Sequence, residues 1–386
     1  MMILIKNATL YSPTACGVMD ILIEGDKIIA ISQDIKVSSN AFQVEIIDAA
    51  GKIVLPGYVD QHVHVIGGGG EDGFKSRTPE VVLSEIIKAG ITTVIGVLGT
   101  DATTRHLESL LAKVRGLDEE GISTYMLTGA YEVPVITLFE DVRRDIILID
   151  KIIGVGEIAI SDHRSSQPTI NELKKVLTQA RIGGMLSGKS GVVQFHVGNG
   201  KEGISPLFDM IESTEVPACH IIPTHINRNK VLLIEGMEFA KRGGFIDITS
   251  CMGTEDLPAT KSIRLCVEND VPISQITMSS DGNGSQTKYD KNGKVIGLTS
   301  AKMTTLHEVV KKAILEENIC AADVFALCTK NPAKANGLWP KKGCIAVGSD
   351  ADLLFLDSKY DIDSLMAKGK FMLKDKVLLA KGTFEE

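Results

Sequence analysis

Short apolar runs bounded by turn residues recur through the middle of the chain, a pattern typical of buried parallel strands. Eight such runs are present, at residues 59–66, 92–98, 124–128, 157–160, 192–197, 221–225, 245–249 and 276–279. Apolar residues at helical spacing separate them; Thr78-Pro79 is expected to begin one helix, and Thr169 with Glu172 matches a capping box. Eight strands alternating with helices over about 250 residues favour an α/β fold, a (β/α)8 TIM-type barrel. A doubly wound parallel sheet is the competing fold, and it would need fewer strands.

Both ends of the chain carry pairs of short apolar runs joined by turn residues, which is a hairpin pattern. One pair lies at residues 21–23 and 28–31, and the other at residues 371–373 and 377–379. Neither end has enough apolar residues to bury a core alone, so we expect the two to pack together. The predicted organisation is a small β-sandwich domain formed by residues 1–55 and 340–386, beside a barrel formed by residues 56–339.

The composition restricts the partners and the location of the protein. Hydrophobic residues make up 44% of the 386 and charged residues 23%, as in soluble globular proteins. No apolar run approaches the roughly 18 residues of a membrane span, and the net charge of −8 argues against nucleic acid as a partner. The seven cysteines have no metal-type spacing, which favours reduced thiols. We therefore expect a cytoplasmic protein that binds neither a membrane nor nucleic acid.

Four of the eight histidines lie at or beside the ends of predicted strands. His62 and His64 are two residues apart, so alternation along a strand directs both to the same face. His196 and His225 end two further strands, and Asp281 follows the last one. One histidine on a strand is usually a hydrogen-bonded core residue, but five such groups at the same end of one barrel indicate a site. Imidazole and carboxylate together suit zinc and similar divalent ions.

Glu157 is an acid within the otherwise apolar fourth strand, where an unpaired charge would be costly. It is either one half of a buried salt bridge or a carboxylate that bridges two metal ions. The other histidines do not fit the set. We expect His307 to be solvated on a helix, His106 and His220 to lie in loops, and His163 to lie at most near the site.

Taken together, these motifs resemble the amidohydrolase superfamily and, within it, the isoaspartyl (β-aspartyl) dipeptidases. The likeness extends from the N-terminal strands to the GCIAVGSDADL segment at residues 343–353. Its most specific stretches are PGYVDQHVH (56–64), GGGGE (67–71), LGTD (98–101), LTGAY (127–131), ISDHRS (160–165), PTHINRN (223–229) and SSDGNGS (279–285).

The resemblance implies a zinc-dependent dipeptidase that hydrolyses the β-linked isopeptide bond of isoaspartyl dipeptides through a metal-activated hydroxide. It implies two Zn²⁺ ions, held by His62, His64 and Asp281 and by His196 and His225. In the best-known pattern of the family a carboxylated lysine bridges the two metals, whereas Glu157 stands at that place in this chain. A glutamate has a shorter arm, so the backbone must approach the metals more closely, which Gly156 would permit.

The resemblance also implies roles around the metals. Asp281 would take the proton of the hydroxide and pass it to the leaving nitrogen, and Tyr131 would stabilise the oxyanion. Without the resemblance, Tyr131 would be interpreted as a packing residue at the barrel rim. Guanidinium groups match carboxylates, and a glutamate matches an ammonium group. The implied substrate-binding residues are Gly69, Glu71, Thr100, Tyr131, Arg164, Arg228 and Ser285.

The partner implied is a small dipeptide, and the chain is expected to form a homo-oligomer, since relatives form octamers. Three alternatives remain open. Another binuclear amidohydrolase, acting on cyclic amides or D-acylamino acids, need not have Glu71, Arg164 and Arg228 together. A mononuclear deaminase would usually carry a glutamate where this chain has Asn199. A non-catalytic scaffold, as occurs among hydantoinase relatives, would be expected to lose metal ligands.

Overall fold

The computed structural model describes the whole chain except residues 1, 38–42, 255 and 290–294. The first two of these segments fall within the predicted small β domain and the last two within the predicted barrel, so the expectations for them lie outside the described residues. No helix among the described residues is both long and apolar enough to cross a bilayer.

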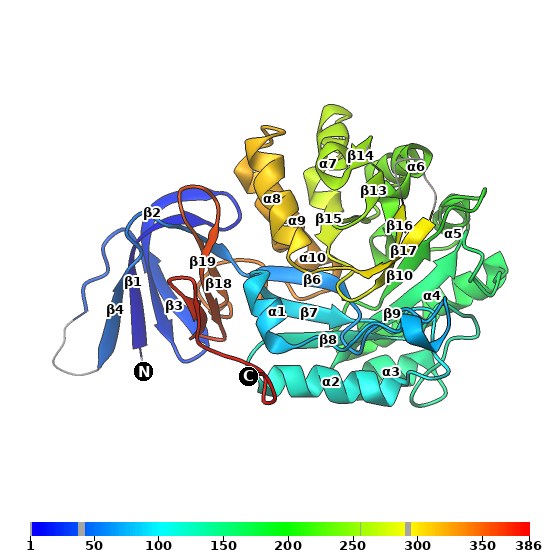
Figure 1. Ribbon diagram of the computed structural model, residues 1–386, viewed down its shortest axis with the longest axis horizontal. Coiled ribbons are helices and arrows are strands. Elements are labelled where there is room, and N and C mark those ends of the chain that lie inside the picture. Colours follow the sequence, from blue (N-terminus) through cyan, green and yellow to red (C-terminus); the bar gives the residue numbers. More distant parts are fainter. Residues whose placement is uncertain (1, 38–42, 255, 290–294) are drawn as a thin grey trace.

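Eight parallel strands form the centre of the larger part of the molecule (Figure 1). Six of them are hydrogen-bonded in chain order: β6 (Tyr58–Val63), β7 (Ile91–Gly96), β8 (Ser123–Thr128), β9 (Ile152–Ile160), β10 (Val192–Val197) and β11 (Ile221–Thr224). The other two, β12 (Ile246–Thr249) and β15 (Ile276–Ser279), pair with each other. A parallel bridge between Val63 and Gly282 joins the segment after β15 to β6. The curled parallel sheet with alternating helices is consistent with the predicted TIM-type barrel.

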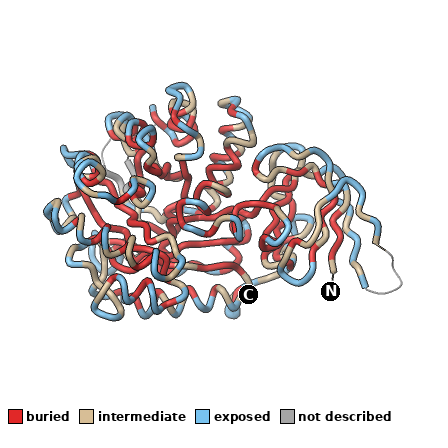
Figure 2. Tube along the Cα trace, turned by 180° about the vertical axis from the view of Figure 1, so that it is seen from behind, coloured by how far each residue is buried: buried red, intermediate tan, exposed pale blue. Residues whose placement is uncertain are grey.

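The helices lie around these strands and cover them from solvent (Figure 2). They are α1 (Leu83–Lys88), α2 (Leu107–Glu119), α3 (Val142–Leu148), α4 (Ile170–Ser187), α5 (Ser205–Ser213), α6 (Lys230–Lys241), α7 (Ala259–Glu268), α8 (Thr305–Leu315), α9 (Ala321–Cys328) and α10 (Lys330–Ala335). Short elements in the loops are η1 (Phe74–Ser76), η2 (Ala218–His220), η3 (Ile226–Arg228), η4 (Ile273–Gln275), β13 (Gly253–Thr254), β14 (Leu257–Pro258), β16 (Ser285–Tyr289) and β17 (Val295–Ser300).

Two predicted helix starts have different outcomes. The capping box at α4 is confirmed, because the Thr169 side chain accepts from the Glu172 amide and the Glu172 carboxylate accepts from the Thr169 amide. The expected start at Thr78-Pro79 is wrong, since α1 begins only at Leu83. The Thr78 hydroxyl instead accepts from the Gly68 amide at 2.6 Å and donates to the Asn283 carbonyl at 2.6 Å. Thr78 therefore fixes loops at the rim instead of capping a helix.

The two ends of the chain combine into one nine-stranded sheet at the side of the barrel strands (Figure 1). Its strands are β1 (Met2–Tyr11), β2 (Ala15–Glu24), β3 (Lys27–Ser32), β4 (Val44–Asp48), β5 (Ile53–Pro56), β18 (Leu353–Leu356), β19 (Ile362–Ala367), β20 (Lys370–Lys374) and β21 (Val377–Leu378). The predicted hairpins β2–β3 and β20–β21 are confirmed, and β5 pairs with β18 to join the two ends. Leu353 and Phe355 face a local core, whereas Leu354 and Leu356 belong to the main core.

A buried lysine explains the acidic residues of the 343–353 motif. Lys342 is only 2% exposed, and its ammonium group lies 2.7 Å from Asp350 and 2.5 Å from Asp352. The same ammonium group donates to the hydroxyl of Ser123, at the start of β8. Because a buried charge is tolerated only when it is paired, these acids connect the nine-stranded sheet to the barrel strands.

His307 is not solvated, contrary to the expectation from its helical position. It lies half-buried on α8, where the Tyr58 hydroxyl donates to its Nδ1 at 3.0 Å and its Nε2 donates to the Tyr360 carbonyl at 2.9 Å. The Tyr58 hydroxyl is itself fully buried and would otherwise lack a partner, which explains why the ring is drawn inward. Burial lowers the pKa of His307 to about 4.

We expect the neutral His307 ring to make the fold acid-sensitive. Its pKa of about 4 in the folded chain lies below the ordinary value of 6.5, so the unfolded chain binds the proton first. The stabilisation is thus present above pH 6.5 and is lost as the pH falls toward 4. Allowing for partial exposure, the free energy of unfolding should lose about 1 kcal/mol more in the wild type than in His307→Gln between pH 7 and 5. Urea denaturation at both pH values measures this difference, and equal losses in the two proteins would contradict it.

Candidate metal centre and active site

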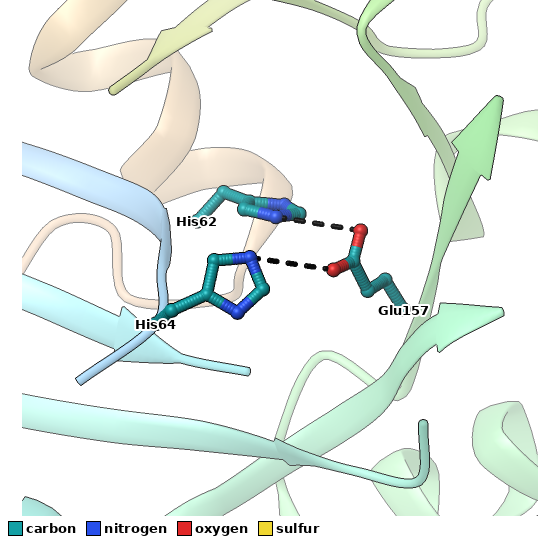
Figure 3. A group of neighbouring side chains, drawn as sticks. All are labelled: His62, His64 and Glu157. Atoms are coloured by element: carbon teal, nitrogen blue, oxygen red, sulfur yellow. Dashed lines mark ion pairs between the residues drawn. The ribbon is translucent and has the colours of Figure 1, made fainter. Parts of the chain in front are cut away.

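Glu157 lies at the centre of two groups of buried side chains, each able to hold a metal ion. In the first group, its two carboxylate oxygens lie 3.4 Å from His62 Nε2 and 3.6 Å from His64 Nε2 (Figure 3). In the second group, Glu157 Oε2 lies 3.2 Å from His196 Nδ1 and 3.9 Å from His225 Nε2. The four predicted histidines therefore converge on one carboxylate, and that carboxylate is the member that the two groups share.

Asp281 completes the first group. Its Oδ1 lies 3.2 Å from His64 Nε2 and 3.6 Å from His62 Nε2. Asp281 and His225 both follow strand ends and both have left-handed backbone conformations, with φ of 54° and 65°. The chain turns sharply at these two residues as it leaves β15 and β11. The turns direct both side chains toward the other members of the cluster instead of along the strands.

An irregularity in β9 aims the Glu157 side chain. Val155 pairs with Val193 and Ile158 with Phe195, so two residues of β9 stand opposite one residue of β10. Such a bulge bends the strand and redirects a side chain, and bulges are frequent beside active sites. A Cβ atom on Gly156 would lie 2.8 Å from the Leu127 side chain, so only glycine allows the strands to approach this closely. The predicted run 157–160 placed Glu157 at the start of its strand. Because β9 begins at Ile152, Glu157 instead lies within the strand.

The electrostatics of the cluster favour an ionised Glu157. Burial alone would raise the pKa of this carboxyl, but the His62 charge and hydrogen bonds from the surrounding histidines lower it well below its ordinary value. Burial opposes protonation of His62, yet the charges of Glu157 and Asp281 raise its pKa to about 10. Burial and the neighbouring His196 instead lower the pKa of His225 to about 3. A metal ion binds the neutral form of imidazole, so a divalent cation that enters this cluster would displace the proton that Glu157 and Asp281 hold on His62.

The hydrogen bonding of the cluster is incomplete, which fits a bound cation. Among the described residues, several fully buried side-chain atoms have no hydrogen-bond partner, including His62 Nδ1 and Nε2, Glu157 Oε1 and Asp281 Oδ1. Buried polar atoms are rarely left without partners, since each costs roughly 1–3 kcal/mol. Imidazole nitrogens and carboxylate oxygens are the donor set that zinc prefers. The residues present therefore fit a metal centre.

Tyr131 and Asp162 contact opposite nitrogens of His196. The Tyr131 hydroxyl lies 2.7 Å from Nδ1, and Asp162 Oδ2 lies 3.1 Å from Nε2. A carboxylate oxygen lies beside each ring nitrogen, Asp162 Oδ2 at Nε2 and Glu157 Oε2 at 3.2 Å from Nδ1, so the two acids together fix the orientation of the ring. Burial raises the pKa of Tyr131 well above its ordinary value, so its hydroxyl stays protonated and able to donate.

The structure shows a role for Asp162 that the sequence had not revealed. Asp162 is buried and accepts from Arg164 through both carboxylate oxygens, each at 2.9 Å, besides orienting His196. Its neighbour His163, which we expected at most near the site, lines the cavity with an 89% exposed side chain, and its Nδ1 lies 3.4 Å from Asp162 Oδ1. The available signal was an acid two residues after a strand end and two residues before an arginine, but this pattern is common on protein surfaces.

The two predicted substrate arginines differ in their partners. Arg164 is paired with Asp162 and, at 2.9 Å, with Glu71. Arg228 donates through Nε to the Val197 carbonyl at 3.0 Å, and no described carboxylate lies within ion-pair distance of it. Burial and the charge of Arg164 lower the pKa of Arg228 from its usual value, although a guanidinium remains charged in proteins. Arg228 is therefore the cation of this site that still lacks an anion.

A cavity of about 460 Å³ opens beside the cluster. Four of the predicted substrate residues line it, namely Gly69, Glu71, Thr100 and Arg164. Ser285 lies against the same loop, since a Cβ atom on Gly69 would come within 3.2 Å of its side chain. Gly69 has φ of 73°, and its Cβ would also lie 2.5 Å from the Ser76 carbonyl, so this turn requires glycine.

The chain matches the model of the amidohydrolase family over residues 53–372 and therefore belongs to that family. It is a hydrolase, as the sequence predicts, and the likeness to the β-aspartyl dipeptidases is also confirmed. The chain is 45% identical to β-aspartyl dipeptidase from the thermophilic, keratin-degrading Fervidobacterium islandicum AW-1, whose crystal structure with a β-Asp-Leu dipeptide matches at a TM-score of 0.92 and covers 100% of both chains. L-hydantoinase from Paenarthrobacter aurescens is 27% identical across 96% of this chain and 88% of that protein. Dihydropyrimidinase from Brevibacillus agri NCHU1002 shares the fold at 16% identity, with a TM-score of 0.70 and coverage of 99% and 97%.

Proposed function

We propose that the protein is a zinc-dependent dipeptidase that cleaves the β-linked isopeptide bond of isoaspartyl dipeptides. The observation that carries the proposal is the set of charges beside the histidine cluster: an arginine without an anion, Arg228, near the paired Arg164 and Glu71. An isoaspartyl dipeptide has two free carboxylates and one free amine, which complement these groups. The solved relative at 45% identity was crystallised with a dipeptide of this kind.

We propose that two Zn²⁺ ions occupy the cluster and that Glu157 bridges them in place of a carboxylated lysine. His62, His64 and Asp281 would hold one ion, and His196 and His225 the other. Support comes from the shared position of Glu157 in both groups and from their unpartnered buried atoms. A bound divalent cation would lower the pKa of water from about 15.7 to about 7, and it would polarise the scissile carbonyl.

Asp281 would transfer the proton, and Tyr131 would stabilise the negative charge that develops on the carbonyl oxygen. In this mechanism Asp281 accepts the proton of the attacking water and delivers it to the leaving nitrogen, so that water and the amide become an acid and an amine. The Tyr131 hydroxyl, held beside His196, donates to the oxygen that becomes negative when the carbonyl is attacked.

Substrate selection depends on residues that line the cavity, namely Gly69, Glu71, Thr100 and Arg164, and on Arg228 and Ser285, which are not among the lining residues. Arg228 receives one carboxylate, and Ser285 and Gly69 assist. Glu71 is paired with Arg164 at present, so binding would exchange that pair for the substrate ammonium on Glu71 and a second carboxylate on Arg164, with Thr100 beside them. An α-linked dipeptide places its carboxylates differently and leaves a half-buried guanidinium unpaired. Rejection by such an unpaired group can reach roughly 10⁴-fold.

We expect Tyr131→Phe to lower kcat on β-Asp-Leu by about 10²-fold and to change KM little. The reason is that its hydroxyl would act mainly on the charge that develops during attack. Tyr125→Phe, a change of the same size in the first half of β8, should leave both constants within about twofold. A Tyr131→Phe variant with an unaltered kcat would contradict the oxyanion role.

The proposed function is tested by elemental analysis together with a substrate panel of β-Asp-Leu, α-Asp-Leu and hydantoin. Hydantoin is included because of the full-length relation to L-hydantoinase. We expect bound zinc, rapid cleavage of β-Asp-Leu and rates at least about 10³-fold lower on the other two. Equal rates on α- and β-linked dipeptides would refute the specificity, and cleavage of hydantoin alone would identify a cyclic-amide hydrolase.

We further propose that residues 1–55 and 340–386 form a β-sandwich domain separate from the hydrolase barrel of residues 56–339. The support is a local apolar core drawn only from the terminal segments, on one face of the nine-stranded sheet. A cytoplasmic location and a homo-oligomeric state remain part of the proposal, and light scattering of the purified protein tests the latter.

A further inference from the structure

The barrel strands have two seams where backbone pairing is sparse. Among the described residues, backbone ladders join β6 to β11 in one sheet and β12 to β15 in another, with no ladder between β11 and β12. Between β15 and β6 there is only the bridge from Val63 to Gly282, which follows β15. Three candidate ligands lie at these seams: His62 on β6, His225 after β11 and Asp281 after β15. Something other than the backbone ladder must fix their relative positions.

One carboxylate spans both seams. Asp247, in the middle of β12, is fully buried and accepts four hydrogen bonds. Its Oδ1 accepts from Gln61 Nε2 at 2.7 Å and from Thr277 Oγ1 at 2.9 Å. Its Oδ2 accepts from Thr224 Oγ1 at 2.8 Å and from Ser279 Oγ at 2.6 Å. The donors come from β6, β11 and β15, so a single side chain ties three strands to β12.

The donors are close neighbours of the candidate ligands along the chain. Gln61 directly precedes His62, Thr224 directly precedes His225, and Ser279 lies two residues before Asp281. Asp247 thus acts on the segments that carry the ligands, through hydrogen bonds to their neighbours instead of to the ligands.

A second carboxylate supports the same seam. Asp60 Oδ1 accepts from the Ser280 amide at 3.1 Å, which links β6 to the residue before Asp281. Gln61 Oε1 accepts from Asn336 Nδ2 at 2.9 Å, so the side-chain amide of Gln61 is held at both its nitrogen and its oxygen. Every side chain of the network is buried, which suits positioning instead of exchange with solvent.

We infer that Asp247 is a positioning residue for the metal centre, holding the segments of His62, His225 and Asp281 in register across the two seams. The inference rests on the proposed function, since it assumes that these residues bind metal. Groups that orient metal ligands through hydrogen bonds typically contribute about 10–100-fold to metal affinity. No contact of Asp247 with substrate is needed.

The test is the affinity of the metal-free protein for Zn²⁺ alone, measured by competition with a chromophoric chelator. Asp247→Asn keeps the shape of the side chain but turns one acceptor into a donor, so at least one hydrogen bond from its partners is lost. We expect about 10–100-fold weaker Zn²⁺ binding, and a changed absorption spectrum when Co²⁺ is bound instead. The Co²⁺ spectrum reports ligand geometry, which a loss of stability alone would not move.

Asp145→Asn is the matched control. Asp145 is equally buried, on α3, and accepts from the Thr128 hydroxyl at 2.5 Å and from the amides of Leu138 and Phe139 at 2.9 and 2.8 Å. It has no hydrogen bond to a residue next to a candidate ligand. We expect a comparable loss of thermal stability, with Zn²⁺ affinity and the Co²⁺ spectrum unchanged. If both variants lose affinity alike, the effect is one of general stability and the inference fails.

Thr224→Val and Ser279→Ala remove one donor each and keep the carboxylate, so they test the inference even if Asp247→Asn does not fold. Each should weaken Zn²⁺ binding, by up to about tenfold. Unaltered affinity in both, in folded protein, overturns the positioning role. The wild type separates this failure from that of the proposed function: if it binds no Zn²⁺ or Co²⁺, the metal centre itself is refuted.

Discussion

Glu157→Ala is expected to lose most of the bound metal and to lower kcat/KM on β-Asp-Leu by more than about 10³-fold. Glu157 is the residue that both candidate metal groups share, and it is fully buried. Its removal takes the anion away from four converging imidazoles, so metal binding at either position would have to proceed without its central carboxylate. A fall of about 8.7 units in the pKa of water corresponds to about 12 kcal/mol at about 1.36 kcal/mol per unit, so loss of the metals leaves little catalysis.

Elemental analysis and kinetics on the same preparation measure both effects. Glu157→Gln is the matched variant, since it keeps the volume and removes the charge, and it should also lose metal. Asp145→Ala provides the control for the loss of a buried acid outside the cluster, and its metal content should equal that of the wild type. If Glu157→Ala retained a full complement of metal, Glu157 would not be a ligand, and its burial would have to be explained by the histidine pairs alone.

Much of the fold could be predicted because its strands follow simple patterns. The runs at 192–197 and 276–279 coincide with β10 and β15, since continuous apolar residues between polar turns leave little freedom in where a buried strand begins. The fourth strand was predicted too short because Gly154 and Gly156 interrupt its apolar pattern. Those glycines allow the close approach of neighbouring strands that aims Glu157, so the feature that obscured the strand also serves the site.

The histidines of the site and Asp281 were predictable because they lie at or beside strand ends, which converge in this fold, whereas Glu157 lies within β9 and was noticed as an acid in an apolar run. The residues that organise those ligands were not. Asp162, Asp247 and Gln61 act through hydrogen bonds between segments far apart in the chain, for which the sequence carries no periodic signal. Thr78 shows the same limitation. Its sequence matches a helix-capping pattern, but its hydroxyl donates to the Asn283 carbonyl in another loop. Polar partners of this kind depend on tertiary geometry, which local patterns cannot specify.

Arg228→Met is expected to lower kcat/KM on β-Asp-Leu by about 10²–10⁴-fold, mainly through KM, with bound metal unchanged. The guanidinium is fixed by the Val197 carbonyl, and no described carboxylate pairs with it. It lies close enough to Asp162 and Asp281 for their charges to affect its pKa, which puts it near the reacting groups. A substrate carboxylate would supply the missing anion, so removing the half-buried guanidinium loses that ion pair without leaving an unpaired protein acid behind.

Two further arginine variants make this prediction specific. Arg228→Lys keeps the charge but loses the planar pair of donors, so we expect an intermediate loss of about tenfold or more. Arg242→Gln breaks surface ion pairs with Glu212 and Glu238, and kcat/KM should stay within about twofold because such pairs contribute little. If Arg228→Met cleaved β-Asp-Leu with an unaltered KM, the free guanidinium would not bind the substrate. The choice of β-linked dipeptides would then have to rest on Arg164 and Glu71, whose mutual ion pair would have to open for each substrate.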